Sequence, residues 1–590
     1  MRWHGSSLAL ASLAALALVH VPVVLAHGGD EMMDMPASHE QNGTDEVRTE
    51  GADYPPTYFA HPEHVALLYA HIVLMVLAWV FALPVAVMLS LVKYRYTLFA
   101  QVAFMVLNGV GVLLATIYNA RTPDLYPNNA HHSVGWVVTW IALAQFTVSL
   151  LSWVARQACG RAASSPTGER NAFLPLTTMM RQNDQTQNPM YSGEYRRSSD
   201  EAESSGSNSH RSSSASTVID DGEAVPFTGY QKEYEDDDDG SLEQLDLATS
   251  NVQGTWRRRA VAAVSSKVWA YFVMAYRLID RIILPLGFIA LASGVATLGR
   301  FFEGKAIFNG LAHWVKGGVF FWLGLFTLGR WSGSFGDLGW AWNVRPRSAS
   351  SKWCPSAEFV ESALIFFYGS TNVFMEHLGH WGGTWHPQDF EHLSITILFM
   401  GGGLCGMLIE STRIRGLLNV STVEELPERA YSDDEEQGER EEPATYSFSL
   451  NPIPALVILL LGTMMASHHQ SSMISTMVHK QWGNLLVGAS FARGLTYVLI
   501  FLRPPTSVMP SRPPTELLAS FALIAGGIIF MASSSDTILG MIHYELDAMF
   551  MYTVTMGLVG LLMAWEIIVL AIKGLAARSE RRLKSTARYE

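Results

Sequence analysis

The sequence has little cysteine and little charge, and both shortages restrict what the chain can be. Only three cysteines occur in 590 residues: Cys159, Cys354 and Cys405. No two of them form a C-x-x-C pair, so neither a lumenal disulfide nor a thiolate zinc site is expected. Charged residues make up 16% of the chain and the net charge is −13. The basic surface typical of nucleic-acid-binding proteins is therefore absent.

Apolar residues are abundant instead, at 49% of the sequence, which suits a membrane protein. A helix needs about 20 apolar residues to cross a hydrocarbon core of ~30 Å. Eleven segments meet this requirement: 65–92, 97–119, 132–155, 282–299, 310–329, 356–378, 389–410, 450–467, 481–502, 514–533 and 548–572. We therefore predict an all-α polytopic membrane protein with about 11 transmembrane helices.

The chain divides into membrane modules and hydrophilic segments. We predict a cleaved signal peptide (1–26), an exoplasmic tail (27–60), a three-helix membrane module (61–156), a disordered cytosolic linker (157–260), an eight-helix membrane module (261–578) and a cytosolic tail (579–590). The signal peptide is indicated by Arg2, an apolar run at 8–19 and a small-residue cleavage site ending at Ala26; an uncleaved signal anchor is the alternative. The linker is too polar to bury enough surface to order itself.

Basic residues predict the orientation of the helices. Lysine and arginine gather in alternate loops, whereas the opposite loops contain only Arg121, Arg300, Lys305 and Lys480. Because basic loops stay in the cytosol, we predict an exoplasmic N-terminus and a cytosolic C-terminus, in the secretory or endomembrane system or the plasma membrane. The sequon Asn42-Gly43-Thr44 would then be glycosylated, and the cytosolic sequon Asn419-Val420-Ser421 would not.

Histidines gather on the predicted exoplasmic side. Of 19 histidines, fourteen belong to the membrane region, all in exoplasmic loops or outer parts of spans: His61, His64, His71, His131, His132, His313, His377, His380, His386, His392, His468, His469, His479 and His543. Imidazole binds transition metals and haem and titrates near neutral pH. The layer therefore indicates a metal ion, haem or protons; the alternative is that histidine simply suits a membrane interface.

Three of these histidines open inward-running helices and have a glycine four residues later: His131 with Gly135, His313 with Gly317, and His479 with Gly483. Residues four apart share one helix face. Glycine on that face admits a flat ligand or a neighbouring helix.

The first module has the pattern of a haem site. His71 and Met75 lie four residues apart on the first span, as do His131 and Gly135 on the third. These motifs resemble the transmembrane cytochrome b family of ascorbate-linked reductases, in which an H-x-x-x-M helix and an H-x-x-x-G helix ligate haem. The resemblance implies that His71 and His131 bind a b-type haem.

The sequence also departs from that family, which uses two histidine pairs, one near each membrane face. Gln101 occupies the place of a histidine on the second span, and Tyr276 precedes the fourth span without a histidine nearby. A single haem cannot carry an electron across a ~30 Å core, so transmembrane reduction is not expected.

The second module collects potential metal ligands at its outer helix ends. The predicted ligands are His377, His380, His392, His468, His469 and His479. Glu376 precedes His377 directly, and Met473 and Met477 precede His479. Histidine with carboxylate suits zinc, and added methionine suits copper. Arg493, inside the ninth span, needs a partner, and Glu566 on the last span is the predicted one, in a structural ion pair.

Short motifs of the second module point to a family. His313-Trp314-Val315-Lys316-Gly317-Gly318, His468-His469-Gln470 and Arg493-Gly494-Leu495-Thr496-Tyr497 resemble the fungal "yeast putative transmembrane protein" (Ytp-like) family. The resemblance implies membership but no activity, because that family has no established one.

Three functions are open. The first is an exoplasmic metal- or haem-binding membrane protein in metal handling or redox, with the bilayer and a metal ion as partners. The second is a transporter or structural protein whose histidines are not ligands. The third is a zinc-dependent membrane hydrolase. Polar residues of the spans in the second module lie at the exoplasmic ends, apart from Arg493. Transport would need a continuous polar path through the helices, so we rank transport below binding. No catalytic residue is identified, and the chain is not expected to be an enzyme.

Overall fold

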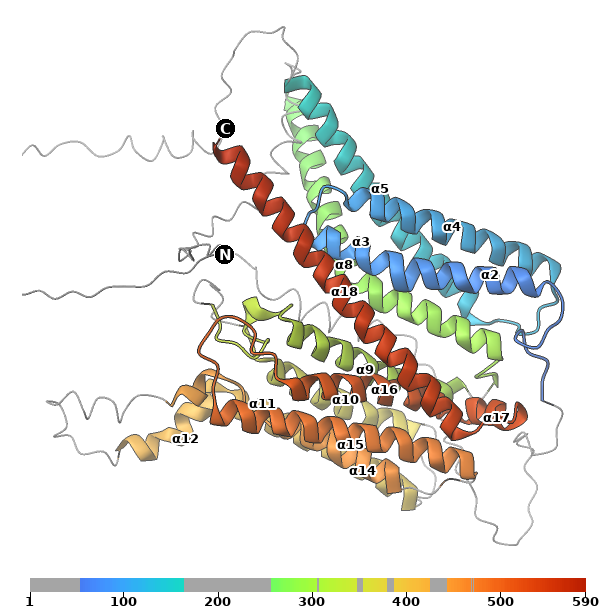
Figure 1. Cartoon of the computed structure of the whole chain (residues 1–590), viewed down its shortest axis with the longest axis vertical. Coiled ribbons are helices and arrows are strands. Elements are labelled where there is room, and N and C mark those ends of the chain that lie inside the picture. Colours follow the sequence, from blue (N-terminus) through green and yellow to red (C-terminus); the bar gives the residue numbers. More distant parts are fainter. Residues whose placement is uncertain are drawn as a thin grey trace, which may run out of the picture. The chain divides into compact units, whose positions relative to one another are not determined.

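Long helices make up the described part of the chain, which in this computed structural model comprises residues 54–163, 256–304, 307–346, 354–378, 387–424, 443–467, 470 and 472–589. No strand occurs within these residues. Each of the eleven segments predicted from apolar length is helical, as expected where backbone groups have no water and must bond internally. The all-α polytopic architecture is thereby confirmed (Figure 1).

The membrane helices alternate in direction along the chain. In order they are α2 (Val65–Val76), η2 (Leu77–Ala82), α3 (Leu83–Leu91), α4 (Thr97–Arg121), α5 (Ala130–Ala163), α8 (Trp256–Gly299), α9 (Ile307–Ser332), α10 (Ala357–Leu378), α11 (Pro387–Glu410), α14 (Ile453–Ser467), α15 (Met473–Leu502), α16 (Pro514–Ala532) and α18 (Ala548–Tyr589). The shorter elements are η4 (Gly336–Leu338), α12 (Thr412–Glu424), η5 (Ala444–Ser447) and α17 (Ser535–His543).

Length and composition support membrane crossing for most of these helices. Within the described residues, nine are long and apolar enough, with Val65–Leu91 counted as one. α14 is a shorter apolar helix of 15 residues, and α10 completes the predicted set.

The chain splits into two compact units, Met1–Trp153 with Thr255–Glu590, and Val154–Gly254. The predicted signal peptide and most of the predicted linker lie outside the described residues. The described ends of the linker, 157–163 and 256–260, are helical and belong to α5 and α8.

Four helical segments form what we call the front bundle: α2–η2–α3, α4, α5 and α8. Its core includes Trp79, Phe104, Val138 and Ile283, one from each segment. From the sequence we assigned the fourth of these helices, α8, to the eight-helix module, because the long linker precedes it. By packing, α8 instead buries Ile283 against the front helices.

The first span changes helix type ahead of a proline. Pro84 has no N–H and so cannot bond the carbonyl one turn back, and the preceding residues Leu77–Ala82 form a π-helix. The Val80 carbonyl accepts a hydrogen bond from Trp565 Nε1 of α18, at 2.8 Å. A side chain from the last helix thus bonds a backbone group that the proline leaves without its usual donor.

The other core helices, α9, α10, α11, α14, α15 and α16, form what we call the rear bundle. Several of its helix crossings are built on glycine. A Cβ on Gly317 of α9 would lie 2.6 Å from the Gly527 carbonyl oxygen of α16. A Cβ on Gly483 of α15 would lie 2.6 Å from the Gly462 carbonyl oxygen of α14. Only hydrogen fits at such distances, so these glycines set how closely the helices pack.

α18 contacts both bundles. It packs on α3 of the front bundle and on α16, α15 and α9 of the rear bundle, and it crosses the view of Figure 1 diagonally between them. A second contact joins α8 to α9, where the Phe288 and Phe321 rings stack with centroids 5.0 Å apart.

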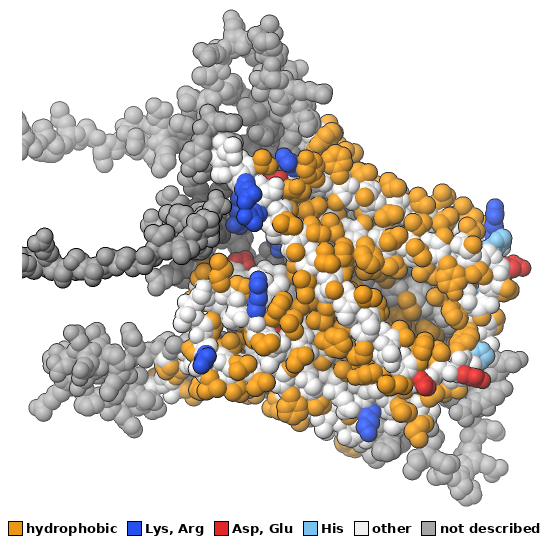
Figure 2. All heavy atoms as spheres, viewed as in Figure 1, with side chains coloured by type: hydrophobic (Ala, Val, Ile, Leu, Met, Phe, Trp, Pro, Cys, Tyr) orange, Lys and Arg blue, Asp and Glu red, His pale blue; other side chains and the backbone are white. Residues whose placement is uncertain are grey.

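The alternating helices give the first unit two chemically different ends. We call the end where α2, α5, α9, α15 and α18 begin the histidine end, and the opposite one the arginine end. On the face in Figure 2, histidines lie at the right edge, most lysines and arginines lie to the left, and hydrophobic side chains cover the region between. This distribution agrees with the bias of basic residues toward one side that membrane-spanning helices usually have.

Candidate metal-binding site

Two histidines of the front bundle lie next to each other at the histidine end. His71 of α2 and His131 of α5 have ring centroids 6.4 Å apart, with an edge-to-face angle of 66°. Both side chains are half-buried. The structure therefore brings together the two residues that the cytochrome-like motifs indicate, although they are 60 positions apart in the sequence.

Hydrogen bonds define the protonation of both rings. His71 Nδ1 lies 2.9 Å from the Gly111 carbonyl oxygen, which can only accept, so Nδ1 carries the hydrogen. His131 Nδ1 lies 3.1 Å from Ser293 Oγ. That hydroxyl donates to the Ala290 carbonyl at 2.9 Å, so it accepts from His131. In the neutral state, Nε2 of each ring therefore carries the lone pair, the arrangement usual for metal-binding histidines.

Small residues around the pair allow its close packing. A Cβ on Gly294 of α8 would lie 3.0 Å from the His131 ring, so glycine makes room for the imidazole. Met75, one turn after His71, packs on Gly111, with Sδ 3.6 Å from where a Cβ of that glycine would stand. His71 and Met75 thus both meet the same glycine of α4, which places imidazole and thioether donors on one helix face.

The rear bundle contains a second pair of histidines at the same end. His313 of α9 and His479 of α15 have ring centroids 6.2 Å apart at 88°. His479 is 7% exposed, and its Nδ1 donates to the Ser475 carbonyl at 2.8 Å. Phe530 stacks on Trp482 beside them, with centroids 4.0 Å apart.

Only part of the predicted rear site can be located. His479 is placed, and its ring partner is His313, which was not among the predicted ligands even though both carry the H-x-x-x-G motif. His377 and His392 lie on α10 and α11, but their side chains are outside the described set. The remaining predicted ligands, His380, His468 and His469, lie outside the described residues altogether. Within the described residues, no group of three or more His, Cys, Asp or Glu side chains could hold a metal ion.

The glycines of the H-x-x-x-G motifs have different surroundings. Gly317 and Gly483 meet neighbouring helices in the crossings described above. Gly135 of α5 has no atom within 4 Å of where its Cβ would stand. The motif therefore serves helix packing in the rear bundle, whereas in the front bundle it leaves open space one turn below His131.

Loops of both bundles hold the histidine end together. Tyr126 donates through its hydroxyl to the Phe301 carbonyl at 2.7 Å, and the Phe302 N–H donates to Asp536 Oδ2 at 2.6 Å. Burial raises the pKa of the Tyr126 phenol, and the nearby carboxylates of Glu303 and Asp536 add to this effect. The phenol therefore stays neutral and keeps its donor at physiological pH.

The predicted pairing of Arg493 with Glu566 is wrong. Arg493 Nε lies 2.8 Å from Glu516 Oε1, as an ion pair without hydrogen-bond alignment, and its Nη1 lies 3.5 Å from Glu361 Oε1. Glu566 Oε2 has no hydrogen-bond partner among the described residues, and Glu566 Oε1 lies 3.9 Å from where a Cβ of Gly329 would stand. Sequence spacing gives the depth of a charge but not the helix that faces it.

Arg493 belongs to a larger buried network near the arginine end. Arg330 pairs with Glu358 at 2.8 Å and with Glu361 at 3.3 Å, so Glu361 links the two arginines. Glu516 is 0% exposed. The interpretation that polar groups of the second module's spans lie at the exoplasmic ends is therefore wrong, because Glu358 and Glu361 near the start of α10, Glu516 near the start of α16 and Arg330 near the end of α9 are buried toward the arginine end.

The fold and these sites define a polytopic α-helical membrane protein with paired histidines at one end and buried charges toward the other. Two family models match the chain: "Protein YTP1-like, C-terminal" over residues 286–574, and "Domain of unknown function (DUF2427)" over residues 52–155. No solved structure matches it.

Relatives over most of the chain identify its family. An uncharacterised membrane protein of Schizosaccharomyces pombe is 33% identical over 520 residues, which cover 86% of this chain and 94% of the relative. The uncharacterised membrane protein YCR061W of Saccharomyces cerevisiae is 42% identical over 296 residues, 48% of this chain and 45% of the relative. Protein YTP1 of the same yeast is 23% identical over 194 residues, 33% of each chain. The chain therefore belongs to the YTP1-like family of membrane proteins, as its motifs predicted.

Proposed function

We propose that this membrane protein binds a transition-metal ion through His71 and His131, with copper as the best chemical fit. The observation that carries the proposal is the geometry of the two rings: each Nδ1 is engaged by an oxygen, and each Nε2 is left as the nitrogen with the lone pair. Engaged Nδ1 atoms fix the orientation of a metal-binding imidazole and raise its basicity.

The separation of the rings suits an ion. Imidazole nitrogens bind metals at about 2.0–2.1 Å, so an ion between two facing rings places their centroids about 6 Å apart. The centroids of His71 and His131 lie 6.4 Å apart. Met75 adds a thioether on the same face as His71, and imidazole with thioether favours copper over zinc.

A single b-type haem at the same histidines is the second candidate. The open space at Gly135 favours it, because a flat ligand needs such a surface. The interior below the pair is less suitable: Met75 Cε lies 2.8 Å from the Cβ position of Gly111, and Trp79 lies 2.5 Å from that of Gly287. The two histidines suit haem, but the side chains that fill the bundle below them leave little room for it. We therefore rank a metal ion without a porphyrin first.

The pair of His313 and His479 supports a second metal position, zinc or copper, in the rear bundle. α10 ends at Leu378, α11 begins at Pro387 and α14 ends at Ser467. Of the predicted ligands, His377 belongs to the last turn of α10 and His392 to the start of α11, and we include both as candidate ligands of this position. By the predicted orientation, both positions face the exoplasmic side, which suits a role in metal handling.

The test measures metal content and visible absorption of detergent-purified protein after loading with Cu(I) and with Zn(II). We expect His71→Ala and His131→Ala to lose one copper per chain, and Met75→Leu to weaken copper more than zinc. His132→Ala is the matched control, because this neighbouring side chain on α5 is exposed.

The outcomes separate the candidates. Copper content that is unchanged in the His71→Ala, His131→Ala double variant would overturn the front site. A reduced-minus-oxidised α band that both single variants abolish would replace the ion with haem. Metal lost only in His313→Ala and His479→Ala would place the site in the rear bundle.

A further inference from the structure

The front bundle has a second buried polar cluster, toward the arginine end. Its members are Ser90 of α3, Gln101 of α4, Gln145 of α5, and Tyr276 and Asp280 of α8, so all four segments contribute. Asp280 is 5% exposed and Gln101 is 7% exposed. These are the positions at which the cytochrome-like pattern lacks its inner histidines, and Gln101 and Tyr276 indeed meet there.

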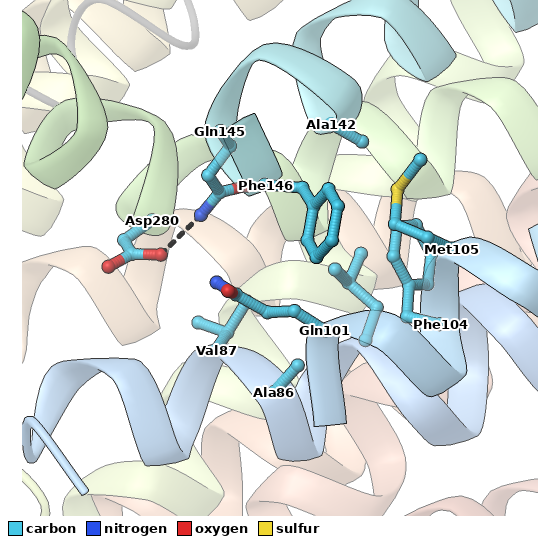
Figure 3. A pocket seen from close by; sticks show the side chains of 10 residues that line it. Ala86, Val87, Gln101, Phe104, Met105, Ala142, Gln145, Phe146 and Asp280 are labelled. Carbon is cyan, nitrogen blue, oxygen red and sulfur yellow. Dashed lines mark hydrogen bonds between the residues drawn. The ribbon is translucent and has the colours of Figure 1, made fainter. Parts of the chain in front are cut away.

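The hydrogen bonds of this cluster converge on one carboxyl. Ser90 Oγ donates to Asp280 Oδ2 at 2.6 Å, and Gln145 Nε2 donates to Asp280 Oδ1 (Figure 3). Because the Ser90 hydrogen is used, the Tyr276 hydroxyl donates to Ser90 Oγ at 2.8 Å. Gln101 Nε2 in turn donates to the Tyr276 oxygen at 3.0 Å. Asp280 is the final acceptor of the whole chain of donors.

One hydrogen bond is missing from this arrangement. Gln101 Oε1 is buried and has no partner among the described residues. A cavity of about 10 Å³ lies beside it, lined in part by Gln101, Gln145 and Asp280 (Figure 3), which is close to the volume that holds one water molecule. A water there would need groups to bond, and the carboxyl and amide around it provide them.

The charge of the cluster is also unbalanced. None of the ion pairs found between described residues includes Asp280. The helices packed against it offer Ser90, Gln101 and Gln145, none of which titrates, while α8 itself offers Tyr276 and the exposed Arg281. A carboxylate within a membrane span needs a partner or a role, and a proton is the smallest partner that neutralises it.

We propose that Asp280 is a proton-binding site of the front bundle. A hydronium ion from the arginine-end solution gives its proton to one carboxyl oxygen, where an O–H bond forms, and a water molecule remains. That water occupies the cavity and donates to Gln101 Oε1, which supplies the missing hydrogen bond. Release reverses the step, so the site exchanges one proton without any other reactant.

The position of the site limits where the proton comes from. His71 and Ser90 are 19 residues apart on one span, which at 1.5 Å per residue is about 28 Å, nearly the ~30 Å of a hydrocarbon core. Trp79, bonded to Asn108 at 2.9 Å, and Phe104 fill the bundle between them. Asp280 therefore exchanges with the arginine end, and it works independently of the metal proposed at the histidine end.

Infrared difference spectroscopy of the purified full-length protein tests this site. Between about pH 5 and 9, where neither free Asp nor Tyr changes charge, we expect a carboxylic-acid C=O band that titrates and shifts in D2O. The band should be missing in Asp280→Asn and kept in Asp124→Asn, whose carboxyl is exposed in a loop. Identical spectra of Asp280→Asn and the unchanged protein at every pH would overturn the proposal.

Two further variants keep the carboxyl and test its surroundings. Ser90→Ala and Gln145→Leu each remove one donor that favours the ionised form. We expect the midpoint of the band to move to higher pH in both. A midpoint that does not move in either variant would show that the titrating carboxyl is not Asp280, even if Asp280→Asn fails to fold.

Discussion

Buried charged residues form one connected network in the rear bundle. Three carboxylates, Glu358, Glu361 and Glu516, share two guanidinium groups, Arg330 and Arg493, in a space closed to solvent. The Trp342 ring lies 4.4 Å from the Arg330 guanidinium and 5.6 Å from that of Arg493, and its face adds attraction for both. Each arginine is therefore held from several sides, and neither can be removed alone without leaving a buried charge.

We expect Arg493→Met to lower the free energy of unfolding by about 3–5 kcal/mol, because Glu516 is left buried without its cation. The measurement is thermal unfolding in detergent, together with the yield of monodisperse protein. The double variant Arg493→Met, Glu516→Gln should recover part of the loss, since it removes the unpaired charge.

Glu566→Gln is the control for this experiment. Glu566 lies apart from the network, so its effect and that of Arg493→Met should add independently. A coupling between the two as large as that between Arg493 and Glu516 would contradict the pairing in the structure.

The sequence identifies a residue that belongs to a local motif, but it does not identify a residue whose burial depends on a distant helix. His71 and His131 could be singled out because a residue four positions away marked the helix face of each. Glu516 could not, because a carboxylate two residues after Pro514 looks like an ordinary first-turn residue near a loop. Its burial depends on which helix comes to lie against α16, and no local pattern carries that information.

At the level of whole helices, glycine determines where pairs approach most closely. Gly483 and Gly488 lie five residues apart on α15, but only the first meets another helix: a Cβ there would lie 2.8 Å from the Ala466 nitrogen, whereas Gly488 has nothing within 4 Å. The two positions therefore separate a packing effect from a general effect of glycine in a helix.

We expect Gly483→Ala to destabilise the protein by about 1–3 kcal/mol, because the added methyl group overpacks the crossing of α14 and α15. Gly488→Ala should be neutral or stabilise by up to about 1 kcal/mol, since alanine favours the helix more than glycine does. Both are measured by thermal unfolding in the same detergent. Equal effects at the two sites would mean that the crossing tolerates a methyl group.

Most elements could be predicted: each of the eleven segments located by apolar length is helical, and nine of the described helices are long and apolar enough to cross a membrane. Their full extents could not. α8 begins at Trp256 and α18 runs to Tyr589, well beyond the apolar runs, because alanine, arginine and lysine continue a helix as readily as leucine does. Hydropathy measures the part of a helix that suits lipid, not where its hydrogen bonds end.

For the whole molecule, the unequal distribution of histidine and arginine makes the orientation testable. We expect N-linked glycan on Asn42 and none on Asn419, because only the former belongs to the predicted exoplasmic side. Asn419 lies in α12, a helix near the arginine end. The measurement is the change in electrophoretic mobility on treatment with an endoglycosidase, in the unchanged protein and in Asn42→Gln and Asn419→Gln.

A mobility shift abolished by Asn419→Gln would invert the predicted membrane orientation, and with it the side on which the metal proposed at the paired histidines would bind. The same result would move the proton exchange of Asp280 to the exoplasmic side. The position of the glycan therefore shows which side of the membrane each of the two proposed sites faces.

The position of α18 has a consequence for how the protein is made. It is the last membrane helix of the chain, and its Trp565 supplies the donor for a carbonyl in the first span, 485 residues earlier. A ribosome has thus delivered every other membrane helix before this bond can form. Until then the Val80 carbonyl lacks its Trp565 donor, so this contact between the first and the last described span is expected to form only after α18 has entered the membrane.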